Sequence, residues 1–377
     1  MHYICEKLSY MTFPFKETQY NISRYPQSGH HSLRPWSAAD EHILAYIEMH
    51  NIQARSTAIF HDRFGFLGCC LQAYHPLSIL YSKSQEKAYK ANLATNKLSV
   101  SDADEQLVTP LAPLPLGIDL ALIKVPKSLD LFRLYLYQLS QSLAEEGVVI
   151  CGFMTRHFSK QLLEIAGEFF EEVTQSKAWK KSRLLILKQK KVVKELSLIH
   201  HVKLNEDRNF QQYFGVFSAK NIDYGSQFLL QHVQLRDEDH RMLDLAAGNG
   251  VLAAGLRAQH PHCELHLLED DWLALESSKL NLKEENTFFH YDNNLESFED
   301  HFFDFVISNP PFHFEHEIDI SIALGLFQEV KRCLKSDGHF QLVASGHLNF
   351  KTHLVKLFKQ VEILAENKKF VVYDCCH

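Results

Sequence analysis

Two segments far apart in the chain repeat one pattern: an acidic residue, an apolar run and a proline turn. Residues 117–128 read GIDLALIKVPKS, and residues 302–313 read FFDFVISNPPFH. The apolar run suits a buried strand in each case, and proline must end it because proline cannot donate to the hydrogen-bond ladder. A repeated unit of this kind constrains the chain to two related domains.

The segments that follow each proline turn match as well. A helical pattern comes next, then an acidic residue and glycine before a strand, and finally a basic pair before another apolar strand. In the first and second half these segments are 130–144 and 320–334, 145–153 and 336–344, and 180–188 and 366–374. Strands that alternate with helices indicate a mostly parallel, doubly wound sheet.

The second half also contains the beginning of such a fold. Residues 241–246 read as a strand, a glycine turn follows, and 251–259 read as a helix; a second strand at 263–268 and a helix at 273–283 come next. The first half shows no such beginning and no glycine-rich turn after a strand. We therefore predict an α/β protein with two Rossmann-like domains, of which the N-terminal one is degenerate.

The predicted organisation is a degenerate domain over 1–188, a linker without clean periodicity over 189–205, and a complete domain over 206–377. The net charge of −7 is divided unequally. Residues 1–195 carry 23 Lys and Arg against 19 Asp and Glu, or +4; the remaining 16 against 27 give −11. A polyanionic partner is therefore expected to meet the first half more easily.

Composition favours a globular protein of the cytoplasm. Hydrophobic residues make up 46% and charged residues 23%, and no apolar run reaches the length of about 18 residues that a membrane span needs. The N-terminal stretch MHYICEKLSYMTFPFKE carries charges within any possible hydrophobic region of a signal peptide, so we expect no signal peptide. The eight cysteines show no CxxC spacing, which predicts reduced thiols. We also expect a monomer.

A glycine turn follows the strand at 241–246. Asp244 is followed by Gly248 and Gly250, which let the backbone approach a ligand closely because they lack a Cβ atom. The next predicted strand ends at Glu269, where a carboxylate can accept hydrogen bonds from a ribose diol. The run also fits a dinucleotide site, and as a plain tight turn it needs no ligand.

Two further polar stretches follow later strands. Asp292 and Asn293 would end the third strand, where they could contact an adenine or form an ordinary turn. His313 and His316 lie close together, but their spacing is not that of HExxH, so we expect no metal.

The turn Asn309-Pro310-Pro311-Phe312 supplies chemistry that a dehydrogenase does not need. The amide oxygen of Asn309 and the carbonyl of Pro310 are two acceptors on a stiff turn, suited to hold an NH2 group toward an electrophile. Phe312 offers a face on which a nucleobase can stack. No general base is required, because the proton can leave nitrogen after transfer.

These residues, in this order and spacing, resemble the class I S-adenosylmethionine-dependent amino-methyltransferases. More narrowly, GVFSAKNIDYGSQFLLQHV (215–233) and SNPPFH (308–313) are similar to the bacterial rRNA guanine-N2 methyltransferases with a duplicated methyltransferase fold. The stretches RYP (24–26) and WSAADEHIL (36–44) look most like the group that modifies 23S rRNA of the large subunit.

The resemblance implies a role for each matching residue. Asp244, Ala246, Gly248 and Gly250 would hold the methionine end of S-adenosyl-L-methionine, and Glu269 its ribose. Asp292 and Asn293 would contact its adenine, and Asn309, Pro310 and Phe312 would bind the guanine. Phe217 and Gly225 belong to a segment before the glycine turn that would lie over the cofactor. The chain departs from the family at Ala246, where glycine is usual.

The implied reaction is methyl transfer to guanine N2 in ribosomal RNA. Other acceptors stay open at this stage: a guanine of 16S rRNA in the small subunit, adenine N6 or a protein glutamine amide. A non-catalytic RNA-binding or ribosome-assembly protein with a methyltransferase shell is the alternative of another class.

Overall fold

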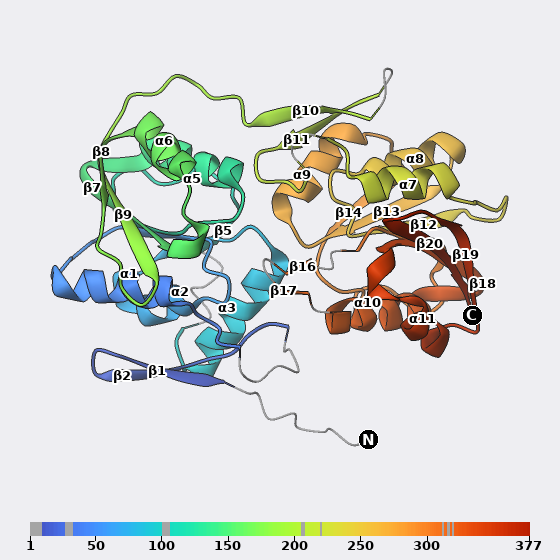
Figure 1. Cartoon of the computed structure of the whole chain (residues 1–377), viewed down its shortest axis with the longest axis horizontal. Helices are drawn as coiled ribbons and strands as arrows, with labels where there is room; N and C mark the ends of the chain where they lie inside the picture. Colours follow the sequence, from blue (N-terminus) through green and yellow to red (C-terminus); the bar gives the residue numbers. More distant parts are fainter. Residues whose placement is uncertain are drawn as a thin grey trace. The chain divides into compact units, whose positions relative to one another are not determined.

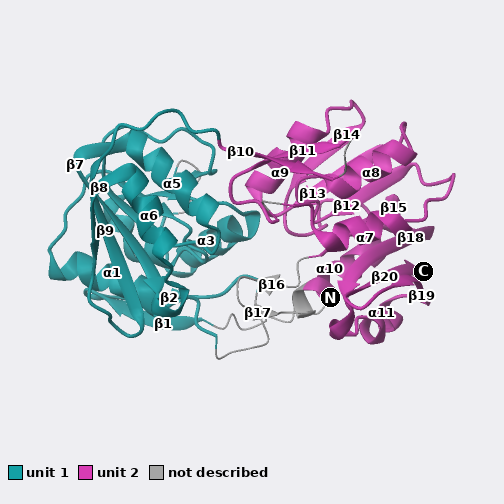
Figure 2. Cartoon of the chain, turned by 45° about the horizontal axis from the view of Figure 1, so that its top comes forward, with its two compact units in different colours: residues 1–197 teal, residues 198–377 magenta. Residues whose placement is uncertain are grey.

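The computed structural model describes residues 10–26, 33–99, 106–204, 208–218, 221–310, 313–314, 317–318 and 320–377, without the side chains of 311–322. The chain forms two compact units, residues 1–197 and 198–377 (Figure 2). The division lies within the predicted linker. That segment holds less irregular chain than expected, because strand β9 runs to Lys190 and strand β10 covers Ile199–Lys203.

The C-terminal unit contains a seven-stranded sheet in the order β14-β13-β12-β15-β18-β20-β19. The first five strands are parallel, β20 is antiparallel to β18, and β19 is antiparallel to β20. The strands are β12 Arg241–Leu245, β13 Glu264–Glu269, β14 Thr287–Tyr291, β15 Phe303–Ser308, β18 Leu334–Ser345, β19 Gln360–Glu366 and β20 Phe370–Cys376. Sequence order reverses between β12 and β15, which is where doubly wound folds bind ligands.

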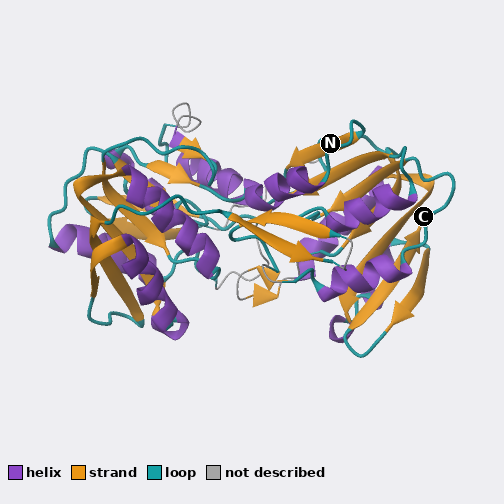
Figure 3. Cartoon of the chain, turned by 90° about the horizontal axis from the view of Figure 1, so that it is seen from above, coloured by secondary structure: helices purple, strands orange, loops and turns teal. Residues whose placement is uncertain are grey.

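Helices flank this sheet on both faces (Figure 3). Alternate strand residues feed two apolar layers: Leu243 packs with the layer of α10 and α11, and Met242 packs with the layer of α7 and α8. The helices are α7 Tyr224–His232, α8 Val251–Gln259, α9 Trp272–Asn281, α10 Ile320–Cys333 and α11 Lys351–Leu357. An antiparallel pair, β10 with β11 Asn209–Tyr213, packs against α9.

The N-terminal unit has the same topology, with the sheet order β5-β4-β3-β6-β7-β9-β8 (Figure 1). Its strands are β3 Thr57–Phe60, β4 Leu77–Ile79, β5 Leu107–Val108, β6 Ile118–Lys124, β7 Leu143–Met154, β8 Phe170–Gln175 and β9 Ser182–Lys190. Its helices are α1 Ala38–Met49, α2 Phe66–Cys70, α3 Lys83–Thr95, α5 Leu129–Ser142 and α6 Lys160–Phe169. A hairpin of β1 Met11–Phe15 and β2 Thr18–Ile22 precedes them.

The prediction that the first half lacks the beginning of the fold is therefore wrong. β3, β4 and β5 are present but short, with four, three and two residues, and their periodicity is too brief to detect. A glycine also ends the turn after β3: Gly65 has φ 73°, as Gly250 has φ 80° after β12. The prediction of two doubly wound sheets is confirmed.

The two acidic residues that begin the repeat have one structural role. Asp119 accepts hydrogen bonds from the backbone of Arg55 and Ser56, just before β3. Asp304 accepts from the backbone of His240 and Arg241, at the start of β12. Each carboxylate therefore joins the amino ends of two neighbouring parallel strands, which explains why both copies retain it.

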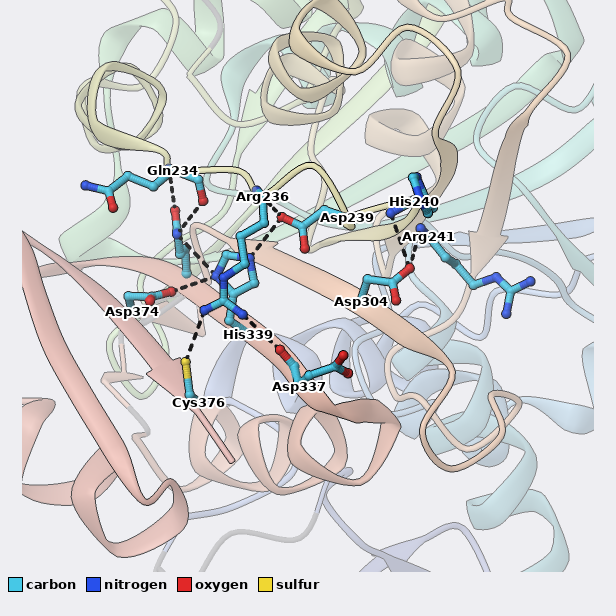
Figure 4. Close-up of polar contacts among 11 residues, drawn as sticks. Gln234, Arg236, Asp239, His240, Arg241, Asp304, Asp337, His339, Asp374 and Cys376 are labelled. Carbon is cyan, nitrogen blue, oxygen red and sulfur yellow. Dashed lines mark hydrogen bonds and ion pairs between the residues drawn. The ribbon is translucent and has the colours of Figure 1, made fainter.

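A buried polar cluster lies at this amino-terminal edge of the C-terminal sheet (Figure 4). His339 is 1% exposed and lies 3.0 Å from Asp239 and 3.0 Å from Asp374, each through one ring nitrogen. Burial lowers the pKa of His339, but the two carboxylates outweigh it, so that the pKa is raised. This charged cluster sits at the sheet edge opposite to the carboxyl ends of the parallel strands.

No helix in the part of the chain that the structure describes is long and apolar enough to cross a membrane.

Candidate active site

The carboxyl ends of β12, β13 and β15 bring together the residues that the sequence singles out. Asp244 is the penultimate residue of β12, Glu269 ends β13, and Asn309 follows β15 directly. β12 pairs with both neighbours, with Leu245 opposite Leu268 on one side and Ser308 on the other. The topological switch point thus places two carboxylates and the amide on adjacent strand ends.

Asp244 is fully buried behind the glycine turn. Its Oδ2 accepts from the backbone N–H of Ala253 in α8 at 2.9 Å, while Oδ1 has no hydrogen-bond partner among the described residues. Burial, with the nearby charge of Glu269, raises the pKa of Asp244 to about 7. A buried acceptor without a partner is costly in a folded protein, and a bound polar ligand would satisfy it.

Glu269 connects β13 to the glycine turn. One carboxylate oxygen accepts from the N–H of Gly248 at 2.8 Å, and the other accepts from the N–H of Asp271 at 2.9 Å. Burial raises the pKa of Glu269 to about 7. Asp271, two residues further on, instead caps α9, since its side chain accepts from the backbone N–H groups of Leu273 and Ala274.

The turn itself leaves room for a ligand. Gly248 has φ 58°, and a Cβ atom built there would meet nothing within 4 Å. At Gly250 a Cβ atom would lie 3.0 Å from Ser278, so that glycine is needed for packing of the turn on α9. The residues present therefore fit S-adenosylmethionine: an open glycine backbone, an unsatisfied carboxylate oxygen and a strand-end acid.

Ala246 occupies the first position of the turn with φ 60°. This left-handed conformation costs alanine roughly 1–2 kcal/mol, whereas glycine adopts it freely. His61 has φ 62° at the matching position after β3, where its N–H donates to Ile79 as that of Ala246 donates to Leu268. The left-handed turn is thus a property of the fold that this chain builds without glycine in both units.

Asn309 is held by α7. Its Nδ2 donates to Asp223 at 2.8 Å and to Ser226 at 2.9 Å. The same oxygen of Asp223 also accepts from the Ser226 N–H. Because a carboxylate oxygen is an acceptor, it is the NH2 group of Asn309 that faces it. The amide is therefore fixed with its hydrogens on the protein. Its Oδ1 makes no hydrogen bond with the described residues and can accept one from another group.

Gly225 makes this contact possible. A Cβ atom there would lie 2.9 Å from the Asp223 carboxylate and 3.5 Å from Asn309 Nδ2. The sequence resemblance gave Gly225 a place over the cofactor; its described contacts connect it to the asparagine turn. Sequence reasoning missed Asp223 and Ser226, although the acidic N-cap before the helix at 224–232 was a usable signal.

The remaining predicted residues are less tightly placed. Pro310 is buried, and Phe312 lies outside the described residues. Asp292 and Asn293 follow β14, and the carboxylate of Asp292 accepts from the N–H of Asn293. Phe217 is 76% exposed ahead of α7, so its predicted position over the cofactor stays a prediction.

The N-terminal unit replaces these groups one by one. Because Ile59 pairs with Leu122 as Asp244 pairs with Ile307, Ile59 takes the place of Asp244. The strand registers also give His61 for Ala246, Arg63 for Gly248, Leu80 for Glu269 and Lys124 for Asn309. Asp40 takes the place of Ser226, because each is the third residue after the N-cap of its helix. Lys124 pairs with Asp40 at 3.0 Å.

Known proteins carry the same two domains. Residues 11–191 match the RLMG N-terminal domain family, and residues 207–374 match the methyltransferase small domain family. The chain is 31% identical to the Ribosomal RNA large subunit methyltransferase G of Yersinia pestis over 363 residues, which cover 92% of this chain and 89% of that protein. The chain belongs to this methyltransferase family.

Further similarities extend over the whole chain. The Ribosomal RNA large subunit methyltransferase G of Yersinia enterocolitica is 30% identical over 370 residues, which cover 94% of this chain and 91% of that protein. The 16S rRNA N2 methyltransferase RsmC of T. thermophilus, solved in complex with AdoMet and guanosine, superposes with a TM-score of 0.74. It covers 98% of each chain at 19% identity, a level that shows the shared fold.

Membership of this family makes the chain an S-adenosylmethionine-dependent methyltransferase. The sequence prediction of the family, the cofactor and the enzyme class is confirmed. No group of three or more His, Cys, Asp or Glu side chains that could hold a metal ion occurs in the described part of the chain.

Proposed function

We propose that this protein transfers a methyl group from S-adenosylmethionine to the exocyclic N2 of a guanine in the rRNA of the large subunit. The observation that carries the proposal is the orientation of Asn309. Its amide hydrogens are held by Asp223 and Ser226, so its oxygen is fixed at the end of β15, beside the strand that carries Asp244. The names of the relatives above support the choice of RNA.

The difficulty of this reaction is the weak nucleophile. The lone pair of guanine N2 is delocalised into the ring, so the amine must be held rather than deprotonated beforehand. Asn309 Oδ1 and the Pro310 carbonyl can each accept one N2–H, and positioning of this kind contributes several kcal/mol to catalysis. Fixed acceptors also favour the positive charge that develops on nitrogen.

The cofactor, when bound, supplies an electrophilic methyl group on its sulfonium sulfur. Nitrogen forms the new bond to the methyl carbon, sulfur keeps the electron pair of the broken C–S bond, and the extra N2 proton then leaves to water. Asp244, Glu269 and the open backbone of Gly248 would hold the cofactor. Phe312 would stack on the guanine, which must be unpaired or flipped out of a duplex.

The N-terminal unit would bind RNA. It carries the charge of +4 counted above, against −11 in the unit that carries the site. With Ile59, Arg63 and Leu80 in place of Asp244, Gly248 and Glu269, it lacks the groups that would hold the cofactor. A monomer in the cytoplasm remains our expectation.

The proposal is tested by methyl transfer from labelled S-adenosylmethionine to deproteinised rRNA, DNA and protein offered separately, followed by mass spectrometry of the digested RNA. We expect the label in RNA, as N2-methylguanosine. Label in N6-methyladenosine or in a protein glutamine would mean that the methyl acceptor is an amine other than guanine N2. Binding of S-adenosylmethionine without methyl transfer to any of the three substrates would support the alternative of a non-catalytic RNA-binding or ribosome-assembly protein.

A further inference from the structure

The carboxyl edge of the N-terminal sheet, which corresponds to the catalytic edge of the other unit, carries exposed basic side chains. Arg156 follows β7, Lys127 follows β6, and Lys181 precedes β9. The N–H of Thr155 donates to the carbonyl of Lys181 at 2.8 Å, so the ends of β7 and β9 lie together. All three basic side chains are exposed, and none forms an ion pair with a described carboxylate.

Two more cations extend this edge toward α1. Lys180 and Arg34 both pair with the carboxylate of Glu41, at 2.8 and 3.1 Å, and their side chains are 60% and 55% exposed. One buried carboxylate thus serves two exposed cations, which leaves a net positive charge.

The carboxylates that the structure describes at the same edge are buried or already paired. Asp40, Glu41 and Asp62 are 2%, 7% and 4% exposed. In the first turns of α3 and α5, Glu86 pairs with two lysines and Asp130 lies 3.6 Å from Arg133. What this edge presents to a partner is therefore predominantly positive.

Aromatic rings accompany the charges. The ammonium of Lys180 lies 4.4 Å from the ring centroid of Trp179, and Trp179 also contacts His42. Phe158, two residues after Arg156, is 39% exposed and stacks on Phe153. Basic groups beside aromatic rings, of which Phe158 is exposed and Trp179 is half-buried, suit single-stranded nucleic acid, in which phosphates bind the cations and bases stack on the rings.

We propose that the edge formed by Lys127, Arg156, Lys180 and Lys181, with Trp179 and Phe158, binds a single-stranded segment of the substrate RNA. This rests on the proposed function for the identity of the partner. The edge has lost the acids of a cofactor site, because Leu80 and Ile59 replace the two carboxylates. Arg63 stands where the other unit has Gly248, and Lys124, in place of Asn309, is paired with Asp40. Because the carboxylates of a cofactor site are absent, this edge is compatible with binding of a polyanion.

The test compares two triple variants of the full chain. The first is Lys127→Gln, Arg156→Gln and Lys181→Gln. The matched control is Arg55→Gln, Lys97→Gln and Lys188→Gln, which removes the same charge from exposed positions toward the amino-terminal edge of the same sheet. The probe is a fluorescein-labelled oligoribonucleotide of about 15 adenosines, titrated over a range of salt concentrations.

We expect the first variant to bind the RNA about 50-fold more weakly near physiological salt. The slope of the logarithm of the binding constant against the logarithm of the salt concentration should be about 2 shallower, because each lost phosphate contact reduces this slope by about 0.7. The control should lose less than about 3-fold. Equal losses in both variants, or no loss in the first, would overturn the proposal. Unchanged RNA binding with weaker binding to whole ribosomal subunits would also overturn it and point to a protein partner.

The proposed function is measured separately, by formation of N2-methylguanosine in rRNA with the unaltered protein. If that product forms and the first variant still binds RNA normally, only the docking edge is wrong. If no such product forms but the first variant loses binding, the edge binds RNA and the proposed reaction is wrong.

Discussion

The strained turn at Ala246 predicts a substitution that stabilises the protein. Ala246 has φ 60°, and roughly 1–2 kcal/mol of conformational cost disappears when glycine takes its place. Glycine also makes the unfolded chain more flexible, which offsets about 0.4–1 kcal/mol. Ala246→Gly should therefore raise the unfolding free energy of the C-terminal unit by about 0.5–1 kcal/mol.

Native-state hydrogen exchange resolves the effect within one unit. Peptides from β12 and α8 should exchange about 2- to 5-fold more slowly in Ala246→Gly, the ratio that this free energy gives. The matched control is Ala254→Gly, inside α8, where glycine should cost about 1 kcal/mol. If both variants destabilise the unit to the same extent, the conformational argument is refuted.

Three other predictions concern positioning and pH. Asp223→Asn keeps a residue able to cap α7 but removes the carboxylate that fixes Asn309, so kcat should fall about 10- to 100-fold while the Kd for the cofactor changes less than about 2-fold. Burial raises the pKa of both Asp244 and Glu269 to about 7, so their contribution to stability is present below their unfolded pKa values and is lost as the pH rises through 7. Binding of the cationic cofactor near pH 7 should then release protons, seen by calorimetry in buffers of different ionisation enthalpy. The raised pKa of His339 means that its contribution is complete below about pH 6.5 and is lost as the pH rises further, and His339→Gln should flatten that loss in urea unfolding.

Each of these has an opposing outcome. Loss of cofactor affinity in Asp223→Asn would give this carboxylate a role in the cofactor site rather than in orientation. A binding enthalpy that is the same in every buffer would mean that the two acids are already ionised. An unfolding free energy of His339→Gln that keeps the pH dependence of the unaltered protein would place the titrating group elsewhere.

The long elements could be predicted from sequence, and the short ones could not. The strand Phe303–Ser308 and the helix Ile320–Cys333 carry enough residues to show their period, and the proline turn marks the strand end. β4 has three residues and β5 has two, so no periodicity develops there. Their place is decided by pairing with β3, a tertiary effect invisible along the chain.

The candidate site divides in the same way. Asp244, Glu269 and Asn309 could be predicted because each lies within one residue of the carboxyl end of a strand whose neighbours are parallel. Asp223 could not be linked to Asn309, since 86 residues separate them and only the packing of α7 brings them together. The conformation of Ala246 was hidden for another reason: alanine gives no sign of a positive φ.

The most direct test of the central claim is the behaviour of Asn309→Ala. Methyl transfer to guanine and the Kd for S-adenosylmethionine should be measured on the same preparation. The account predicts that transfer falls by more than about 100-fold while the Kd stays within about 2-fold, because Asn309 orients the acceptor amine and does not hold the cofactor. A collapse of cofactor binding together with transfer would contradict it and make the asparagine turn a structural support of the cofactor site.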